Sequence, residues 1–346
     1  MRRFLTALAF LLACGLLNGC REPLYQNQGY VFGTLVDISI YGESEQRAHE
    51  LTDHVLADFQ SLHHRLHAWQ KDSDLSRINQ AFSESNKPIP ISAELAHIIR
   101  DASALSVQSG GLFNPAIGGL IQQWGFQRDE FSAVKIDDPA IAKLIKAKPQ
   151  MTDIVLSGNT AYSTNPAVKL DLGGYAKGYA LDRASAYLRN QGVKNALVNI
   201  GGNIIAIGKH GDRAWRVGIQ HPRHSGAIAT LALEDGWAIG TSGDYQRYFE
   251  LGGKRFCHII DPRTGYPAQG TQAVTILVPP GLNAGTLSDV ASKPIFISSP
   301  AQRKTAAQAM NIDEFLVIDG QGKIFASPGM RKRLQWVEKN VVPAIF

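Results

Sequence analysis

The spacing of apolar and polar residues predicts a strand and a long helix near the start of the chain. Residues 30–41 alternate between apolar and polar positions around Gly33, which favours a β-strand. Apolar residues then recur at intervals of three and four through 51–66, which is the period of one helical face. Another helix is expected from Ser92, which can cap its start, to Ser109, where a Gly-Gly pair stops it.

The second half of the chain is predicted to form mainly short β-strands. They follow a helix that begins near Tyr175 and ends at Gly192. Strands are expected at 196–200, 203–207, 215–219, 228–233, 274–278, 315–319 and 323–326. Helical patterns lie at 287–297 and 301–310. Strands and helices are segregated instead of alternating regularly, which predicts an α+β fold.

The beginning of the chain has the pattern of a secretory signal. Arg2 and Arg3 precede an apolar run over 4–17, which is shorter than the ~20 residues that a helix needs to span a bilayer. The sequence Leu17-Asn18-Gly19-Cys20 follows and resembles the lipobox of bacterial lipoproteins, in which the cysteine is acylated and becomes the new N-terminus. An ordinary signal peptide with an incidental cysteine is the alternative.

We therefore expect three parts in the chain. These are a lipoprotein signal peptide at 1–19, a lipidated tether at 20–28 with the lipid on Cys20, and one folded domain at 29–346. The protein is then expected in the bacterial cell envelope, anchored to a membrane by its lipid and facing the periplasm. Because Cys14 leaves with the signal peptide, no disulfide is expected in the mature chain.

Composition and charge narrow the classes of function. Of the 346 residues, 44% are hydrophobic and 19% are charged, which is typical of a globular protein. The formal net charge is +5, and the basic residues are spread along the chain without clusters or interleaved aromatics. A nucleic-acid-binding surface is therefore not indicated.

Several common catalytic and binding motifs do not occur in the sequence. Neither Gly-x-x-x-x-Gly-Lys-Ser/Thr nor a strand-to-helix Gly-x-Gly-x-x-Gly is present. Cys257 adjoins His258, but neighbours on a strand point to opposite faces, so a Cys-His dyad is not favoured. His63 and His67 have a spacing compatible with metal binding on a helix, but a third ligand is missing.

A glycine-rich turn at 170–180 offers a site for an anion. The segment predicts an apolar strand that ends near Asp171, then Gly173 and Gly174, then the start of a helix that carries Lys177. Backbone N–H groups and the dipole at the start of a helix attract negative charge, and the lysine adds a positive one. A plain strand-to-helix turn is the alternative for these residues.

Four further polar or glycine-rich segments have local explanations of their own. A hairpin turn accounts for the double glycine within 198–203. The segments 240–245 and 258–267 are rich in turn-forming residues, although turn chemistry does not account for His258. The segment 286–289 fits a capping box at the start of a helix.

Taken together and in this order, the five segments resemble the ApbE-type FAD:protein FMN transferases, a family of bacterial and often lipid-anchored enzymes. The similarity starts at Phe32-Gly33-Thr34 and also includes residues 69–79, 113–115 and 124–126, so it covers essentially the whole mature chain. The resemblance implies two interwoven lobes of mixed or antiparallel sheet with packed helices, related to the T-fold. FAD would lie in the cleft between the lobes.

The resemblance also implies a reaction that requires Mg²⁺. FAD is cleaved at its diphosphate, FMN passes to a Ser or Thr hydroxyl of a partner protein, and AMP leaves. Such phosphoryl transfer depends on positioning and on charge neutralisation, which suits glycines, a lysine and a metal site. The implied acceptors are flavoproteins of periplasmic or inner-membrane redox complexes, such as the sodium-translocating NADH:quinone reductase or the Rnf type. A Mg²⁺-dependent FAD pyrophosphatase and a non-catalytic FAD-binding lipoprotein are the alternatives.

The resemblance assigns roles to individual residues of this chain. His258, Asp289 and Lys177 are the implied catalytic residues, and His258 would contact the reacting phosphate or accept the hydroxyl proton. The implied FAD-binding residues are Phe32, Gly33, Thr34, Trp69, Asp171, Gly173, Gly174, Lys177, Asn199, Gly201, Gly202, Ser242, His258 and Ile260. Mg²⁺ would be held by the side chain of Asp289 and the carbonyl of Gly174.

One position departs from the family pattern. Four residues after the metal-binding aspartate the family commonly has a threonine, whereas this chain has Lys293. A protonated lysine cannot be a metal ligand. On a helix Ser292 could supply the missing hydroxyl, while Lys293 pairs with Asp289 or reaches a phosphate. We therefore expect a looser Mg²⁺ requirement. The alternative is that Asp289 only caps a helix that begins after Thr286.

Overall fold

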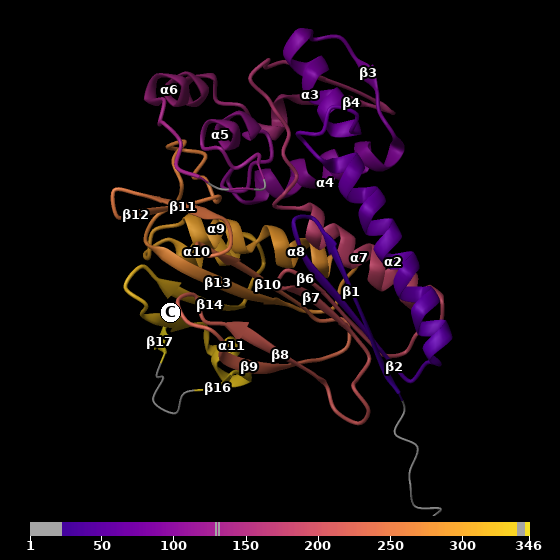
Figure 1. Cartoon of the computed structure of the whole chain (residues 1–346). Coiled ribbons are helices and arrows are strands. Elements are labelled where there is room, and N and C mark those ends of the chain that lie inside the picture. Colours follow the sequence, from indigo (N-terminus) through magenta and orange to yellow (C-terminus); the bar gives the residue numbers. More distant parts are fainter. Residues whose placement is uncertain (1–22, 129, 131, 338–342) are drawn as a thin grey trace, which may run out of the picture.

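A nine-stranded sheet forms the centre of this computed structural model, which describes residues 23–128, 130, 132–337 and 343–346 (Figure 1). The strand order is β1-β2-β6-β7-β10-β13-β14-β15-β17, and neighbours are antiparallel except for the parallel pair β15 and β17. The strands of this sheet are β1 Leu24–Val31, β2 Thr34–Tyr41, β6 Ala196–Ile200, β7 Asn203–Ile207, β10 Ala238–Gly243, β13 Thr271–Val278, β14 Glu314–Asp319, β15 Ile324–Ala326 and β17 Ala344–Ile345. The described part of the chain is α+β, as expected.

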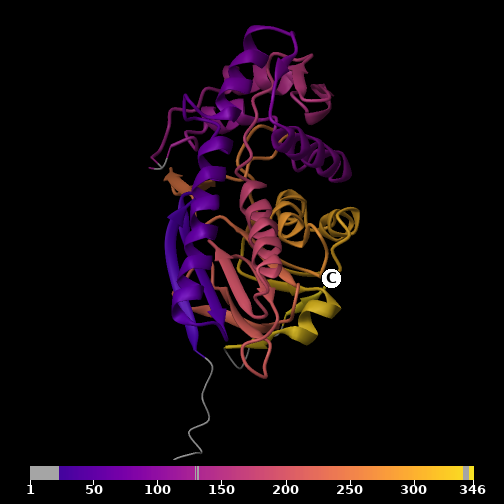
Figure 2. The same cartoon turned by 90° about the vertical axis from the view of Figure 1, so that its right-hand side faces the viewer.

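The helices that pack on this sheet cover one of its faces, except for the short helix Pro328–Arg333, which lies on the other face together with a smaller sheet (Figures 1 and 2). The helices are α2 Glu45–Leu66, α3 Asp74–Glu84, α4 Ala93–Gln108, α5 Gly118–Gln123, α6 Asp138–Ala147, α7 Ala176–Asn190, α8 Ala284–Val290, α9 Ser292–Ile297, α10 Arg303–Ala309 and α11 Pro328–Arg333, with a 3₁₀ turn η1 at Met151–Asp153. The other strands form small sheets. One contains β3 Ile89–Pro90, β5 Thr160–Ser163 and β4 Ile154–Ser157, and another contains β16 Gln335–Trp336, β9 Ala227–Leu233 and β8 Trp215–Gln220. A two-stranded sheet pairs β11 Tyr248–Leu251 with β12 Lys254–Cys257.

Strand β13 shows how the two faces are built. All eight of its residues are buried. Val274 and Ile276 belong to the core beneath α8 and α9, whereas Ala273 and Leu277 belong to the core beneath β8 and β9. Successive side chains of a strand point to opposite faces, so a strand covered on both sides buries all its side chains, which here include Thr271, Gln272 and Thr275.

A third apolar cluster joins parts of the chain that are far apart in sequence. Trp124, which follows α5, and Ile141 of α6 pack with Phe249 of β11 and with Ile260. The indole Nε1 of Trp124 also donates a 2.7 Å hydrogen bond to the carbonyl of Gly265. The upper lobe in Figure 1 is therefore closed by segments that come from both halves of the chain.

The first strand begins earlier than expected. The predicted signal peptide, Cys20 and the next two residues lie outside the described residues. Residues 24–28, assigned to the tether, are part of β1, which pairs along its whole length with β2. Gln26, Asn27 and Gln28 made this segment look like a linker, but backbone pairing at a sheet edge does not require apolar side chains. Phe32 and Gly33 form the turn between the strands, so the expected single strand is a hairpin.

The helix expected at 287–297 is two helices. α8 ends at Val290 and α9 begins at Ser292. Pro294 has no N–H to donate to the carbonyl four residues earlier, so one helical hydrogen bond is missing at the junction. Among the described residues, no helix has both the length and the apolar composition that crossing a bilayer requires.

Candidate active site

A cavity of about 810 Å³ lies where the glycine-rich segments meet. It is bordered by the β1–β2 turn, the end of α2, the start of α7 and the segments that follow β10 and β12. Every residue predicted to bind FAD lines it, namely Phe32, Gly33, Thr34, Trp69, Asp171, Gly173, Gly174, Lys177, Asn199, Gly201, Gly202, Ser242, His258 and Ile260. Asp289 also lines the cavity, whereas Ser292 is not among its lining residues.

Two hairpin turns form one wall. Phe32 has a positive φ of 56°, which is uncommon for a residue with a side chain, and its ring packs edge-on against that of His63 at 5.4 Å. In the neighbouring turn, Gly201 has a φ of 56°, and a Cβ there would lie 2.5 Å from Oγ1 of Thr34. The hydrogen bond from the Gly202 N–H to Oδ1 of Asn199 closes the β6–β7 turn at 2.9 Å. The turn and the cavity wall are thus the same structure.

Trp69 is held in one orientation at another wall. Its indole Nε1 donates to Oδ2 of Asp171 at 3.1 Å, and Nζ of Lys169 lies 4.4 Å from the centroid of its ring. The other carboxylate oxygen of Asp171 accepts from the N–H of Gly173 at 2.8 Å. A partly buried aromatic ring fixed in this way is suited to stack on a planar ligand.

The segment before α7 is not the strand that the sequence suggested. Lys169 forms only an isolated parallel bridge with Ile117. Instead, Asn79 of α3 holds the backbone of Leu170 with two hydrogen bonds, of 2.6 Å from the N–H and 2.8 Å to the carbonyl. A side-chain amide can satisfy both polar groups of a buried residue in place of a neighbouring strand.

A carboxylate of the protein itself meets the first turn of α7. Oδ2 of Asp289, in α8, accepts a 3.1 Å hydrogen bond from the N–H of Gly178. The alternative in which Asp289 caps its own helix is not seen, because α8 begins after Asn283 and Asp289 lies in its last turn. The negative charge at the start of α7 is therefore supplied, at least in part, from within the chain.

Two lysines neutralise this buried carboxylate. The side chain of Asp289 is 1% exposed, and the ammonium of Lys293 contacts its Oδ1 and, at 2.6 Å, its backbone carbonyl. Burial by itself would raise the pKa of Asp289, but the positive charges of Lys293 and Lys177 hold that pKa below its ordinary value. Burial also lowers the pKa of Lys177, against the opposing attraction of Asp289.

The residues expected to bind Mg²⁺ provide oxygen ligands of the right kind, but one of these oxygens is already engaged in hydrogen bonds within the protein. Carboxylate, carbonyl and hydroxyl oxygens are what Mg²⁺ prefers. The hydroxyl of Ser292, however, donates to the carbonyl of Asp289 at 2.9 Å and lies 2.7 Å from the hydroxyl of Ser242. Asp289 and the carbonyl of Gly174 remain the candidate ligands. Within the described residues, no group of three or more His, Cys, Asp or Glu side chains is placed to hold a metal.

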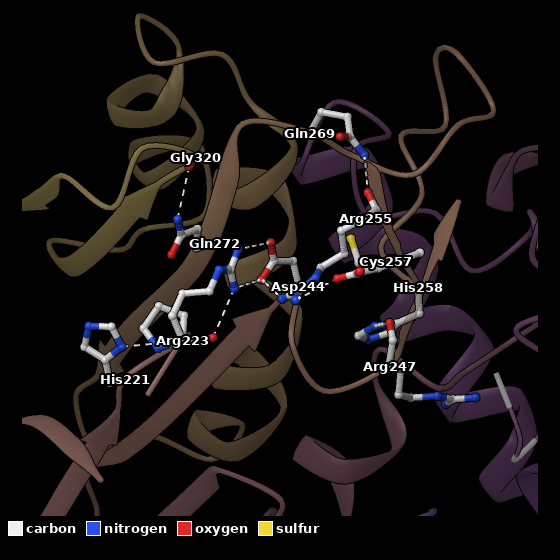
Figure 3. Close-up of polar contacts among 12 residues, drawn as sticks. His221, Arg223, Asp244, Arg247, Arg255, Cys257, His258, Gln269, Gln272 and Gly320 are labelled. Atoms are coloured by element: carbon white, nitrogen blue, oxygen red, sulfur yellow. Dashed lines mark hydrogen bonds and ion pairs between the residues drawn. The ribbon is translucent and has the colours of Figure 1, made fainter. Parts of the chain in front are cut away.

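His258 is neutral and has a defined tautomer. Its Nδ1 lies 3.2 Å from the backbone carbonyl of Arg247, which also accepts the N–H of His258 at 3.0 Å (Figure 3). A carbonyl only accepts, so Nδ1 carries the proton and Nε2 carries the lone pair. Burial, with the positive charges of Arg247 and Lys177, lowers the pKa of His258 to about 3. Its neighbour Cys257 is buried, which raises the pKa of the thiol to about 12.

Some residues of the cavity were not expected from the sequence. Arg247, Gln246 and Asp37 line it, as does His63, which had been considered only as a metal ligand. Arg247 lies two residues after the polar segment 240–245 and donates from Nη2 to the carbonyl of Phe126 at 2.8 Å. A polar run that continues past a predicted turn was the signal that could have identified it.

The fold and this cavity define an α+β enzyme with a cleft between two lobes that is lined by basic side chains and by a buried carboxylate. The ApbE family model matches residues 32–316, and the chain belongs to the ApbE family of flavin transferases. The family and the fold class expected from the sequence are thereby confirmed.

Named relatives and solved structures agree with this family and fold. A protein from Rhodobacter capsulatus named FAD:protein FMN transferase is 38% identical over 97% of this chain, which spans 64% of that protein's length. One of the same name from Klebsiella pneumoniae is 29% identical over 96% of this chain and 98% of its own. The crystal structure of the ApbE protein from Thermotoga maritima is 29% identical, with a TM-score of 0.80 over 90% of this chain and 99% of that one. Flavin transferase ApbE from Vibrio cholerae gives a TM-score of 0.76 at 26% identity, over 90% and 99% of the two chains.

Proposed function

We propose that this protein transfers FMN from FAD to a Ser or Thr hydroxyl of a partner flavoprotein and releases AMP. The observation that carries the proposal is the meeting of three groups in one cavity of a chain of the ApbE family. These groups are the neutral His258, the amine of Lys177 and the buried carboxylate of Asp289. Phosphoryl transfer needs a proton acceptor and fixed positive charge near the phosphates, and this set provides both.

The proposed step is a displacement at phosphorus. The acceptor hydroxyl oxygen forms a bond to the phosphorus of the FMN half, and the bond from that phosphorus to the oxygen bridging to AMP breaks. The hydroxyl proton passes to Nε2 of His258, and AMP leaves with the bridging oxygen. Lys177 would contact phosphate oxygens, and Trp69 would stack on one of the two ring systems of FAD. Mg²⁺, when bound through Asp289 and the carbonyl of Gly174, would add positive charge beside the diphosphate.

The partners and location follow from the lipobox and from the family. We propose that Cys20 carries lipid and holds the protein at a membrane of the bacterial envelope, on its periplasmic side. The acceptors would be flavoproteins of redox complexes of the sodium-translocating NADH:quinone reductase or Rnf type. Support for the anchor comes from the sequence Leu17-Asn18-Gly19-Cys20, which lies outside the described residues.

One incubation tests the proposal. The protein is mixed with FAD, Mg²⁺ and the apo form of an acceptor flavoprotein, and flavin fluorescence is sought after denaturing electrophoresis. Fluorescence on the acceptor, absent when its target Thr is replaced by Val, is the expected result. Free FMN and AMP without labelled acceptor would identify a pyrophosphatase instead. Unchanged FAD would identify a protein that only binds it.

A further inference from the structure

The ammonium of Lys293 lies where a metal ion would have to approach Asp289. We propose that Lys293 is a built-in cation that competes with divalent metal for Asp289 and serves the diphosphate when the metal is absent. Only the second role, in which Lys293 serves the diphosphate, rests on the proposed function. The first concerns cation binding and can be measured without any acceptor protein.

The position of Lys293 is set by the backbone around it. The break between α8 and α9 leaves Asp289 and Lys293 four residues apart across the junction, and Nζ reaches both the carbonyl and Oδ1 of Asp289. The lysine stem passes directly over Gly174, where a Cβ would lie 2.9 Å from Cε of Lys293. The side chain is only 16% exposed, so it is packed in this place and does not extend into solvent.

The oxygens of Asp289 are already used. Oδ2 accepts from the N–H of Gly178, and Oδ1 is held by Lys293. A divalent ion that binds Oδ1 directly must therefore displace the ammonium or remain beside a like charge. Ser292 does not compensate as a ligand, because its hydroxyl is bonded to Ser242 and to the carbonyl of Asp289. Divalent metal should consequently bind weakly to this chain.

The ammonium of Lys293 can also supply part of the positive charge that the metal would place beside the diphosphate. Lys293 lines the cavity together with Lys177 and Arg247, so three basic side chains border the space assigned to the substrate phosphates. A lysine carries one charge where Mg²⁺ carries two, and its N–H groups can donate to phosphate oxygens. We therefore expect transfer to continue at a reduced rate after divalent metal has been removed.

The binding test uses Mn²⁺ as the probe, followed by electron paramagnetic resonance at neutral pH. Wild type is compared with two variants. Lys293→Thr removes the charge and offers a hydroxyl, whereas Lys293→Met removes the charge but keeps an unbranched side chain of similar length, so that packing and folding are preserved. Both variants should bind Mn²⁺ at least about tenfold more tightly than wild type. A tenfold ratio corresponds to the removal of about 1.4 kcal/mol of repulsion between Mn²⁺ and the ammonium. Adding Asp289→Asn to Lys293→Thr should abolish the gain. Equal affinities in wild type and both variants, or no Mn²⁺ binding by any of them, would overturn the proposal.

The activity test is made with and without a chelator. Wild type should retain measurable FMN transfer in the chelator, whereas Lys293→Thr should lose it and regain it with Mg²⁺. Complete loss in the chelated wild type would show that Lys293 does not replace the metal. If no protein transfers FMN under any condition, the proposed function fails, and the Mn²⁺ measurement still decides the competition.

Discussion

The backbone N–H of Gly178 in α7 donates a 3.1 Å hydrogen bond to the carboxylate of Asp289 in α8. The absence of a side chain on Gly178 lets the two helices approach closely at this point. A Cβ on Gly178 would lie 2.4 Å from the carbonyl oxygen of Gly285 and 2.8 Å from Cβ of Asp289. Nearby, Asp182 of α7 accepts three hydrogen bonds of 2.7 Å from the backbone of Gly285 and from the backbone and hydroxyl of Thr286. Helix α7 thereby determines where the carboxylate of α8 lies.

Replacing Gly178 with Ala should separate the helices. The new Cβ would meet backbone and Cβ atoms that cannot rotate away, so the free energy of unfolding should fall by about 1 to 3 kcal/mol and transfer should weaken. Urea denaturation and kcat/KM for FAD measure the two effects. Gly281→Ala is the matched control, because a Cβ there has no neighbour within 4 Å. Equal stability of the two variants would contradict this account.

Lys177 should contribute through its charge. Lys177→Ala removes one charge-assisted contact to FAD. The resulting fall in kcat/KM should correspond to about 1.5 to 3 kcal/mol of lost transition-state stabilisation. Lys143→Ala, on the exposed side of α6, should leave kcat/KM unchanged. If the Lys177 variant matches wild type, its ammonium does not contact the substrate.

His258 should keep its neutral form through mildly acidic pH. Because its pKa is about 3 in the folded protein, the pH profile of kcat/KM should show no acid limb near 6.5 that belongs to this residue. The unfolded chain binds the proton near the ordinary value, so His258 costs stability progressively as pH falls from about 6.5 toward 3. Urea denaturation at pH 7.5 and 4.5 should therefore show a larger loss for wild type than for His258→Gln. An equal loss in both would indicate an ordinary pKa.

Asp244 should hold the loop that leads to Arg247. Arg223 donates to both of its carboxylate oxygens at 2.7 Å, Arg255 lies 3.8 Å away, and the N–H of Asp244 donates to the carbonyl of Gln272 at 3.0 Å (Figure 3). Asp244→Asn should loosen this wall of the cavity and raise KM for FAD about fivefold, the equivalent of about 1 kcal/mol.

The control for the Asp244 prediction is an ion pair whose residues do not line the cavity. Arg77 of α3 pairs with Asp74, and its side chain is 64% exposed. Arg77→Gln should leave KM for FAD as in wild type. A KM that changes equally in both variants would show that the loss of any ion pair, and not this loop, is responsible.

Cys20 should determine attachment to the membrane. Cys20→Ser should yield a protein that is not acylated and is found in the soluble fraction, since the lipid is the proposed anchor. Cys14→Ser is the control, because that residue would leave with the signal peptide, and its protein should remain in the membrane fraction. Retention of the Cys20 variant would point to an ordinary signal peptide.

The sequence alone determined the helices and strands whose ends are set by local chemistry. Ser92 caps α4 by accepting from the N–H of Leu95, and the strands at 196–200 and 203–207 lie where they were predicted. Hydrophobic period, capping side chains and glycine stops act within a few residues, so they can be recognised without the rest of the chain. Comparison with a known family also identified fourteen residues that line the cavity.

The tertiary structure decided what depends on distant partners. Leu24–Gln28 became a strand because β2 offered its backbone, and Leu170 needed no strand because Asn79 satisfies it. The pairing of Lys293 with Asp289 was one of two arrangements that the sequence left open, and the approach of α7 to α8 at Gly178 was not predicted. Such contacts are set by how helices and sheets pack across the whole molecule, and the local pattern of residues does not contain that geometry.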